Sequence, residues 1–312
     1  MTVSYNFATA WEAIADEQPG ARALVQGDCV VSWGAFDDRA ARLAGGLLEL
    51  GVQEGAKVAS YLYNSNEYME GVFATWKLRG APVNVNYRYL EDELLYLVDN
   101  SDAEVLLFHG VLAEHVARIM DRAATVKVWV QVDDGHPLLD GAVAFEDVIA
   151  GADPMPRIDR DGDDLYLLYT GGTTGMPKGV MWRQEDLFQT LGGGGDATGA
   201  GPRPRTLAEH VANVEAGQQK QRILPACPIM HGTGLFTALN ALANGGSAVT
   251  VDSRKLDAHA LWDAVSRHGV SAIAIVGDVF ARPMLKALDE KPYNLENLRL
   301  IVSSGVMWTL EV

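Results

Sequence analysis

The stretch that decides the fold reads Leu165-Tyr-Leu-Leu-Tyr-Thr-Gly-Gly-Thr-Thr-Gly-Met-Pro-Lys-Gly-Val180. Its apolar first part is typical of a strand, which leads into a loop of glycines and threonines ending at Lys178 and a second short strand over 179–182. Glycines let successive backbone N–H groups point at one anion, threonine hydroxyls add donors, and the lysine adds a positive charge. The composition therefore predicts a phosphate-binding loop. The three threonines and the lysine argue against a glycine-rich hairpin without a ligand.

This loop is not of the Walker A type. A Walker A loop reads G-x-x-x-x-G-K-[ST] and opens a helix. Here Lys178 follows a proline and is followed by Gly179 and an apolar strand. A P-loop NTPase is therefore disfavoured.

The sequence on both sides of the loop alternates between strand and helix patterns. Apolar residues recur at four-three spacing over 32–50, with Ser32 as N-cap and Gly51 as stop. A strand is expected over 57–63 and a helix over 67–79. Further strands are expected at 81–85, 104–108, 126–132, 165–170, 247–251, 271–276 and 298–303. This alternation predicts an α/β fold with two layered parallel-sheet subdomains, each with helices on both faces.

Two composition shifts suggest the organisation of the chain. A Pro, Gly and Asp-rich stretch at 151–164 is interpreted as a connection, and a Gly, Pro and Ala-rich stretch at 192–217 as a surface insertion. The expected regions are a first α/β subdomain over 1–160 and a nucleotide- and acyl-binding α/β region over 161–312.

Composition limits the partners. The formal net charge of -16 disfavours nucleic acid and anionic membrane surfaces, and 48% hydrophobic content suffices for a large core. The longest apolar stretches, such as 271–276, are far shorter than the ~20 residues that cross a bilayer. Two cysteines and the absence of a secretory pattern predict a reducing cytoplasm and no membrane insertion.

The segment 169–179 resembles the phosphate-binding signature of the adenylate-forming superfamily, which includes acyl-CoA synthetases, luciferases and peptide-synthetase adenylation domains. Gly171 stands where the usual signature has serine, so the loop is expected to rely on its backbone and threonines. The block 32–108 is similar to the N-terminal subdomain of the same superfamily. The segments 180–186 and 303–308 resemble actinobacterial fatty-acyl or steroid-side-chain CoA ligases.

The resemblance implies an AMP-forming acyl-CoA synthetase that uses ATP, Mg²⁺ and CoA on a carboxylic acid. The residues that it implies for catalysis are Lys178, Thr174 and His231. Those implied for nucleotide binding are Thr170, Gly171, Gly172, Thr173, Thr174, Gly175, Lys178, Ser304 and Gly305. Those implied for the acid are His231, Gly232, Leu235, Phe236 and Asp278. No residue of this chain is expected to be a metal ligand.

Plainer interpretations of two of these residues stay open. His231 could simply cap a helix, or pair with Cys227 as a base or metal ligand, although Pro228 argues against a common helix face. Asp278 could be a solvated helix N-cap. Acyl chain length, and the choice between fatty and steroid acids, are not fixed by the sequence.

The resemblance also implies elements that have no counterpart before Val312. These are a metal-binding glutamate, a ribose-binding aspartate, a hinge and a small C-terminal lid domain with a catalytic lysine. The 312-residue chain is therefore expected to be inactive alone and, with an exposed sheet edge, to form a homo-oligomer. The alternatives are a non-catalytic nucleotide- or fatty-acid-binding fragment, and adenylation for transfer to a carrier-protein thiol.

Overall fold

Two β-sheets organise the computed structural model, which describes residues 5–171, 176–191, 204–217 and 220–309. In this part of the chain, a six-stranded sheet has the order β13-β12-β10-β11-β1-β2 and a seven-stranded sheet the order β7-β6-β5-β3-β4-β8-β9. The strands of the six-stranded sheet are β1 (Arg22–Gln26), β2 (Cys29–Ser32), β10 (Arg222–Pro225), β11 (Ser247–Thr250), β12 (Ala272–Ile275) and β13 (Leu300–Ser303). Those of the seven-stranded sheet are β3 (Lys57–Tyr61), β4 (Ala81–Asn84), β5 (Ala103–His109), β6 (Val128–Val132), β7 (Val143–Ala144), β8 (Leu165–Thr170) and β9 (Lys178–Arg183).

The predicted strands and the predicted fold class are confirmed, with two additions. The hairpins β1–β2 and β8–β9 are antiparallel, whereas the other pairs are parallel. Both antiparallel strands, β2 and β9, lie at a sheet edge. Each sheet also combines early and late strands, because β1 and β2 join β10 to β13, and β8 and β9 join β3 to β7.

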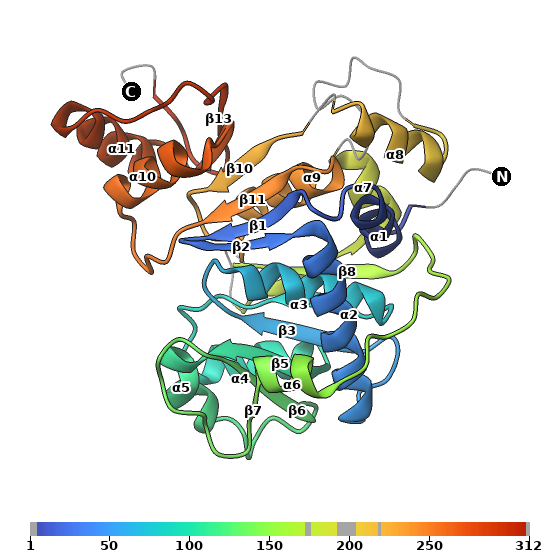
Figure 1. Ribbon diagram of the computed structural model, residues 1–312. Coiled ribbons are helices and arrows are strands. Elements are labelled where there is room, and N and C mark those ends of the chain that lie inside the picture. Colours follow the sequence, from blue (N-terminus) through green and yellow to red (C-terminus); the bar gives the residue numbers. More distant parts are fainter. Residues whose placement is uncertain (1–4, 172–175, 192–203, 218–219, 310–312) are drawn as a thin grey trace.

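The helices cover both faces of each sheet (Figure 1). One central core receives side chains from both sheets and from α1 (Phe7–Glu17), α2 (Trp33–Glu49), α3 (Asn66–Lys77), α6 (Phe145–Gly151), α7 (Gln184–Thr190), α8 (Leu207–Glu215) and α9 (Gly232–Ala243). The outer face of the seven-stranded sheet packs on α4 (Glu91–Asn100), η1 (Gly110–Leu112) and α5 (Ala113–Ala117). The outer face of the six-stranded sheet packs on α10 (Ala258–His268) and α11 (Asp278–Glu290).

Local signals explain the best predicted helix. Ser32 is the N-cap of α2, and its hydroxyl accepts a hydrogen bond from the backbone N–H of Ala35 at 3.2 Å. Gly51 follows the helix with φ of 88°, a left-handed conformation that favours glycine. The expected spacing of apolar residues places Phe36, Ala40 and Leu43 in the central core.

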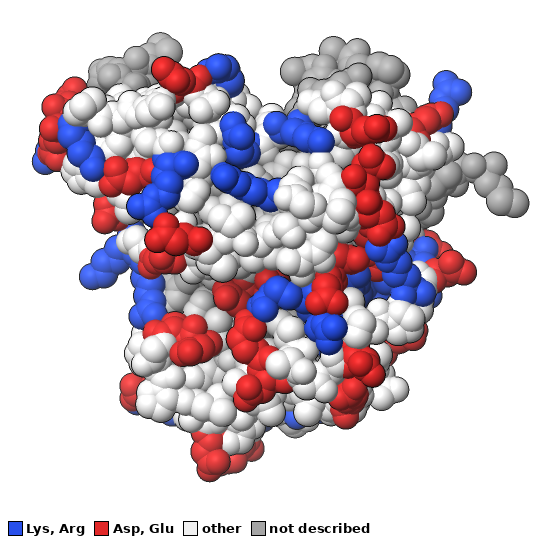
Figure 2. Space-filling view, in the orientation of Figure 1, with Lys and Arg blue, Asp and Glu red and all other residues white. Residues whose placement is uncertain are grey.

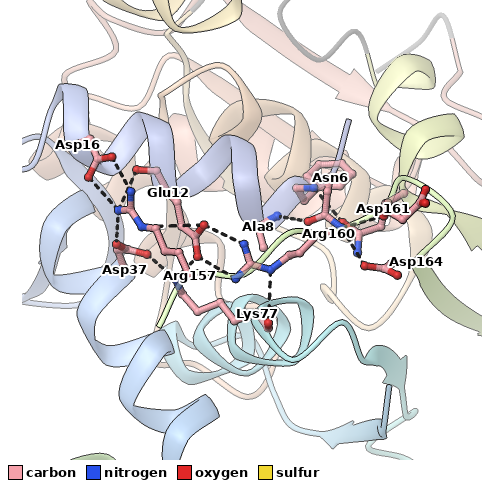
Figure 3. Close-up of polar contacts among 12 residues, drawn as sticks. Asn6, Ala8, Glu12, Asp16, Asp37, Lys77, Arg157, Arg160, Asp161 and Asp164 are labelled. Carbon is pink, nitrogen blue, oxygen red and sulfur yellow. Dashed lines mark hydrogen bonds and ion pairs between the residues drawn. The ribbon is translucent and has the colours of Figure 1, made fainter. Parts of the chain in front are cut away.

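Buried charges fix the chain just before β8 (Figure 3). Arg160, whose side chain is 1% exposed, donates to both carboxylate oxygens of Glu12 on α1 at 2.8 and 3.0 Å. It also donates to the carbonyl of Lys77 at the end of α3 at 3.3 Å. The predicted connection at 151–164 is therefore anchored to the central helices immediately before the strand that leads into the predicted phosphate loop.

None of the helices in the described part of the chain has the length and apolar character needed to span a membrane.

Candidate functional site

The β8–β9 hairpin presents the predicted phosphate-binding loop. Thr170 and Lys178 are directly opposite in the antiparallel register, so their side chains lie on the same face of the hairpin. Both residues and Gly171 are exposed, and Lys178 forms no ion pair with any described carboxylate. The predicted nucleotide-binding residues Gly172, Thr173, Thr174 and Gly175 lie outside the described residues. The hairpin thus brings a hydroxyl and an ammonium group together at one end of the loop.

The second part of the site is the turn that connects β10 to α9. His231 occupies the N-cap position of α9, but its imidazole makes no capping hydrogen bond and is exposed. A Cβ on Gly234 would lie 2.6 Å from the carbonyl oxygen of Pro228, so only glycine allows this close approach. Loss of hydration, with a further contribution from the positive charge of Arg88, lowers the pKa of His231. The His231 imidazole is therefore harder to protonate than an imidazole in water, and it makes no capping hydrogen bond at the start of the helix.

Two asparagines from the seven-stranded sheet hold this turn. Asn64, after β3, donates to the carbonyls of Pro225 and Cys227 at 3.3 and 3.0 Å and accepts from the N–H of Ile229 at 2.7 Å. Asn84, the last residue of β4, donates to the carbonyl of Met230 at 2.6 Å. Neither asparagine is among the residues predicted for the site. The available signal was a polar residue at the carboxyl end of a parallel strand.

The third part of the site follows β13. Gly305 has φ of +90°, and a Cβ on it would lie 3.9 Å from the hydroxyl oxygen of Thr233 in the first turn of α9. A Cβ on Gly232 would lie 3.6 Å from a methyl carbon of Leu168 in β8. The start of α9 therefore lies between β8 and the Ser304–Gly305 turn. These contacts connect Gly232 with β8, the strand that ends at Thr170, and Gly305 with the first turn of α9.

A cleft of about 680 Å³ opens beside His231. Its lining includes Arg88 and Arg254, and the apolar side chains of Met230, Val279 and Phe280. On the face shown in Figure 2, acidic and basic side chains are intermixed among the described residues and form no broad basic surface. An anion would therefore be attracted by the local cations of the cleft, Arg88 and Arg254, and not by the overall charge of the chain, which is negative.

The remaining predicted acid-binding residues lie outside the lining of this cleft. Leu235 is fully buried in the central core, and Phe236 is half-buried with its ring centroid 5.7 Å from that of Trp182. Asp278 is the first residue of α11, whose N-cap is Gly277. Its carboxylate accepts from the N–H and hydroxyl of Thr309 at 3.0 and 2.9 Å, and these hydrogen bonds lower its pKa.

The alternative site of Cys227 and His231 gains no support. Cys227 is 1% exposed, and burial raises the pKa of its thiol to about 12. A protonated thiol is a poor nucleophile and a poor metal ligand. In the part of the chain that the structure describes, no three histidine, cysteine, aspartate or glutamate side chains form a group that could hold a metal ion.

Curated proteins with similar sequences are CoA ligases. The chain is 36% identical, over 98% of its length, to a 3-oxocholest-4-en-26-oate–CoA ligase of Rhodococcus rhodochrous, and it spans 56% of that protein. It is 34% identical, over 99% of its length, to the medium-chain acyl-CoA ligase Mig of Mycobacterium avium, and spans 59% of it. The chain therefore covers a little over half of the curated relatives it matches.

Solved structures share the fold. An inhibitor-bound N-terminal domain of FACL13 from Mycobacterium tuberculosis superimposes with a TM-score of 0.81 at 21% identity, covering 100% of this chain and 72% of that one. An anthranilate CoA ligase, AuaEII, in complex with anthranoyl-AMP superimposes with a TM-score of 0.80 at 20% identity, covering 97% of this chain and 55% of that one. The family model described as AMP-binding enzyme matches residues 11–312, and the chain belongs to this family.

Proposed function

We propose that this chain forms the nucleotide- and acid-binding part of an AMP-forming acid–CoA ligase. The observation that carries the proposal is the convergence of the β8–β9 hairpin, the His231 turn and the Ser304–Gly305 turn around the start of α9. The named activities of the relatives from Rhodococcus rhodochrous and Mycobacterium avium support it.

The proposed chemistry has two steps. A carboxylate oxygen of the acid attacks the α-phosphorus of ATP, and the bond to pyrophosphate breaks, which gives an acyl-adenylate. The sulfur of CoA then attacks the acyl carbon, the thiol proton is lost, and AMP leaves. In the first step two anions must meet, so the positive charge of Lys178 and the hydroxyl of Thr170 would favour the approach and bind the departing phosphates.

Mg²⁺ belongs to the proposal as an ion that arrives with the phosphates of ATP. Among the described residues no three His, Cys, Asp or Glu side chains form a group that could hold a metal ion, so the chain's own share would be the hydroxyl and ammonium donors of the hairpin. Thr174 and the other residues between 172 and 175 remain candidates, as their sequence predicts.

The acid would occupy the cleft beside His231. Its apolar side, with Met230, Val279 and Phe280, fits a hydrocarbon tail. Arg88 and His231, which also line the cleft, would donate hydrogen bonds to the carboxylate head group. The relatives named above support a fatty or steroid-side-chain acid. Gly232, Leu235 and Phe236 would act here by shaping α9, and Asp278 by holding Thr309.

Compartment and assembly are secondary proposals. Cys29 and Cys227 are free thiols, which suits a reducing cytoplasm. The edge strand β9 exposes Val180 (46%) and Met181 (70%), which would favour a homo-oligomer. Sedimentation velocity over a hundredfold concentration range tests this, and a concentration-independent monomer would exclude it.

ATP–pyrophosphate exchange tests the main proposal. The 312-residue chain and a version carried to the length of its curated relatives are compared on acids from acetate to a steroid side-chain acid. We expect exchange in the longer form and ATP binding without turnover in the shorter one. Binding without exchange in both forms would favour a non-catalytic binding protein, and adenylation without thioester formation on free CoA would favour a carrier-protein thiol as acceptor.

A further inference from the structure

The side-chain amide of Asn84 contacts both halves of the candidate site. Its oxygen accepts from the backbone N–H of Tyr169 at 2.5 Å, and its nitrogen donates to the carbonyl of Tyr169 at 2.9 Å. The same nitrogen donates to the carbonyl of Met230 at 2.6 Å. Tyr169 precedes Thr170 at the start of the phosphate-binding loop, and Met230 precedes His231.

The amide replaces a strand-to-strand peptide contact. β4 and β8 share a single registered pair, Val83 with Leu167, so the regular ladder ends just before Asn84. Beyond that point the Asn84 side chain both accepts from and donates to the backbone of Tyr169, as a peptide group in a neighbouring strand would. This leaves one N–H of the amide, which is directed to Met230.

Burial makes these contacts costly to lose. Asn84 is 2% exposed, so water cannot easily replace a missing partner. Both donor hydrogens are used, which means that an aspartate would lose both donations and bring a charge toward two carbonyls. The three hydrogen bonds therefore need both the donors and acceptor of an amide and the side-chain length of asparagine.

We infer that Asn84 is a positioning residue that fixes the end of β8, from which the phosphate-binding loop begins, and the His231 turn relative to each other. A ligand that displaces the backbone at Tyr169 must also displace the amide that holds Met230. Ordering of one segment by a ligand thus lowers the ordering cost of the other, which makes the binding of ATP and acid cooperative. This inference rests on the proposed function.

Asn84→Leu removes the three hydrogen bonds at similar volume. Gln131→Leu is the matched control, because Gln131 is 3% exposed and its amide also bridges backbone groups, Pro137 and Leu139, away from the site. Decanoate affinity is measured in the presence and absence of α,β-methylene ATP with Mg²⁺. We expect the ATP analogue to strengthen decanoate binding at least about fivefold in the unchanged chain and in Gln131→Leu. In Asn84→Leu the analogue should have no effect on decanoate binding.

Binding of each ligand alone tests the proposed function. The ratio of decanoate affinity with the ATP analogue to that without it tests the role of Asn84. A ratio that Asn84→Leu leaves intact, or a ratio of one in a chain that binds both ligands, overturns the inference. Hydrogen exchange gives a readout without ligands. Asn84→Leu should accelerate amide exchange at Tyr169 and through 230–232 together, and Gln131→Leu at neither; unchanged exchange at either segment would contradict the inference.

Discussion

The ammonium group of Lys77 lies 2.8 Å from the carboxylate of Glu12, and both side chains are at most 5% exposed. A second carboxylate, that of Asp37, lies 2.6 Å from the same nitrogen, and Arg160 binds Glu12 from the other side (Figure 3). This cluster joins α1, α2 and α3 to the segment before β8. Removal of one member of a buried ion cluster leaves its partners unpaired away from water.

Lys77→Met should therefore lower the free energy of unfolding by about 3 kcal/mol or more. Lys57→Met is the control, since Lys57 pairs with Asp102 at 3.1 Å in a solvent-exposed bridge whose side chains are 34% and 73% exposed. An exposed pair of this kind contributes at most about 1 kcal/mol. Urea unfolding of the two variants decides the matter, and equal effects would show that the buried cluster is not a source of stability.

A second prediction concerns Gly179, at the start of the strand that follows the phosphate-binding loop. A Cβ at this position would lie 2.7 Å from the ring of Tyr169. The ring cannot swing away freely, because its hydroxyl donates to Asn100 at 2.8 Å and the residue is 7% exposed. Gly179→Ala should therefore cost about 1–3 kcal/mol of stability and weaken ATP binding by displacing β8 and β9.

Gly20→Ala is the control for this change, because no atom lies within 4 Å of a Cβ built there. It should alter stability by less than about 0.5 kcal/mol and leave ATP affinity unchanged. Thermal unfolding and calorimetric ATP titration measure the two effects. Full ATP affinity in Gly179→Ala would mean that the hairpin geometry at Tyr169 does not matter for the nucleotide.

A third prediction concerns pH. His109 is 6% exposed, and its Nδ1 accepts from the N–H of Tyr63 at 3.2 Å. Burial lowers its pKa from 6.5 to about 4; Asp134 opposes this shift and Arg254 adds to it. Between these two pH values the unfolded chain binds a proton that the folded chain does not. The free energy of unfolding should therefore fall as the pH drops from 6.5 to 4, by up to about 3 kcal/mol from this residue.

His109→Asn keeps an acceptor for Tyr63 and cannot titrate. Urea midpoints are measured for both proteins at pH 7, 6, 5 and 4. The midpoint of the unchanged chain should fall more steeply toward low pH than that of the variant, so that the two midpoints converge. His136→Asn removes a histidine whose side chain is 45% exposed and serves as the control. If the urea midpoints of the unchanged chain and of His109→Asn fall in parallel with pH, protonation of His109 does not lower the free energy of unfolding.

Local signals allowed much of this structure to be predicted. The cap and spacing of α2 depend on residues within one helix, and the hairpin of Thr170 and Lys178 depends on residues eight apart. By contrast, Asn84 binds Tyr169 and Met230, which lie 85 and 146 positions away. Nothing near Asn84 in the sequence reveals that its amide is shared between two distant segments.

The same reason explains why the combination of early and late strands in one sheet is not predicted from the sequence. β1 pairs with β11, whose residues are more than two hundred positions later in the chain. The strand at 22–26 is not among those predicted, and its apolar pattern does not identify its partner, because every parallel strand buried on both faces has a similar pattern. Pairing is decided by packing of the central helices between the sheets, which depends on the whole chain.

The last prediction tests the residue on which the phosphate-binding interpretation depends most. Lys178 is exposed, lies opposite Thr170 and has no described carboxylate partner. A hydrogen bond from an ammonium to a phosphate contributes about 1.5–3 kcal/mol, which corresponds to roughly 10- to 150-fold in affinity. Lys178→Ala should weaken ATP binding by this factor, and Lys178→Ala with Thr170→Val should weaken it further.

Lys286→Ala controls for the loss of one positive charge, because Lys286 is 80% exposed on α11. Its effect should vanish at 0.5 M salt, where screening removes long-range attraction, whereas the effect of Lys178→Ala should persist because a direct contact is lost. Equal salt dependence for both variants would mean that Lys178 attracts the nucleotide from a distance and does not touch it. The phosphates would then have to bind elsewhere, and the cations of the cleft, Arg88 and Arg254, would become the candidates.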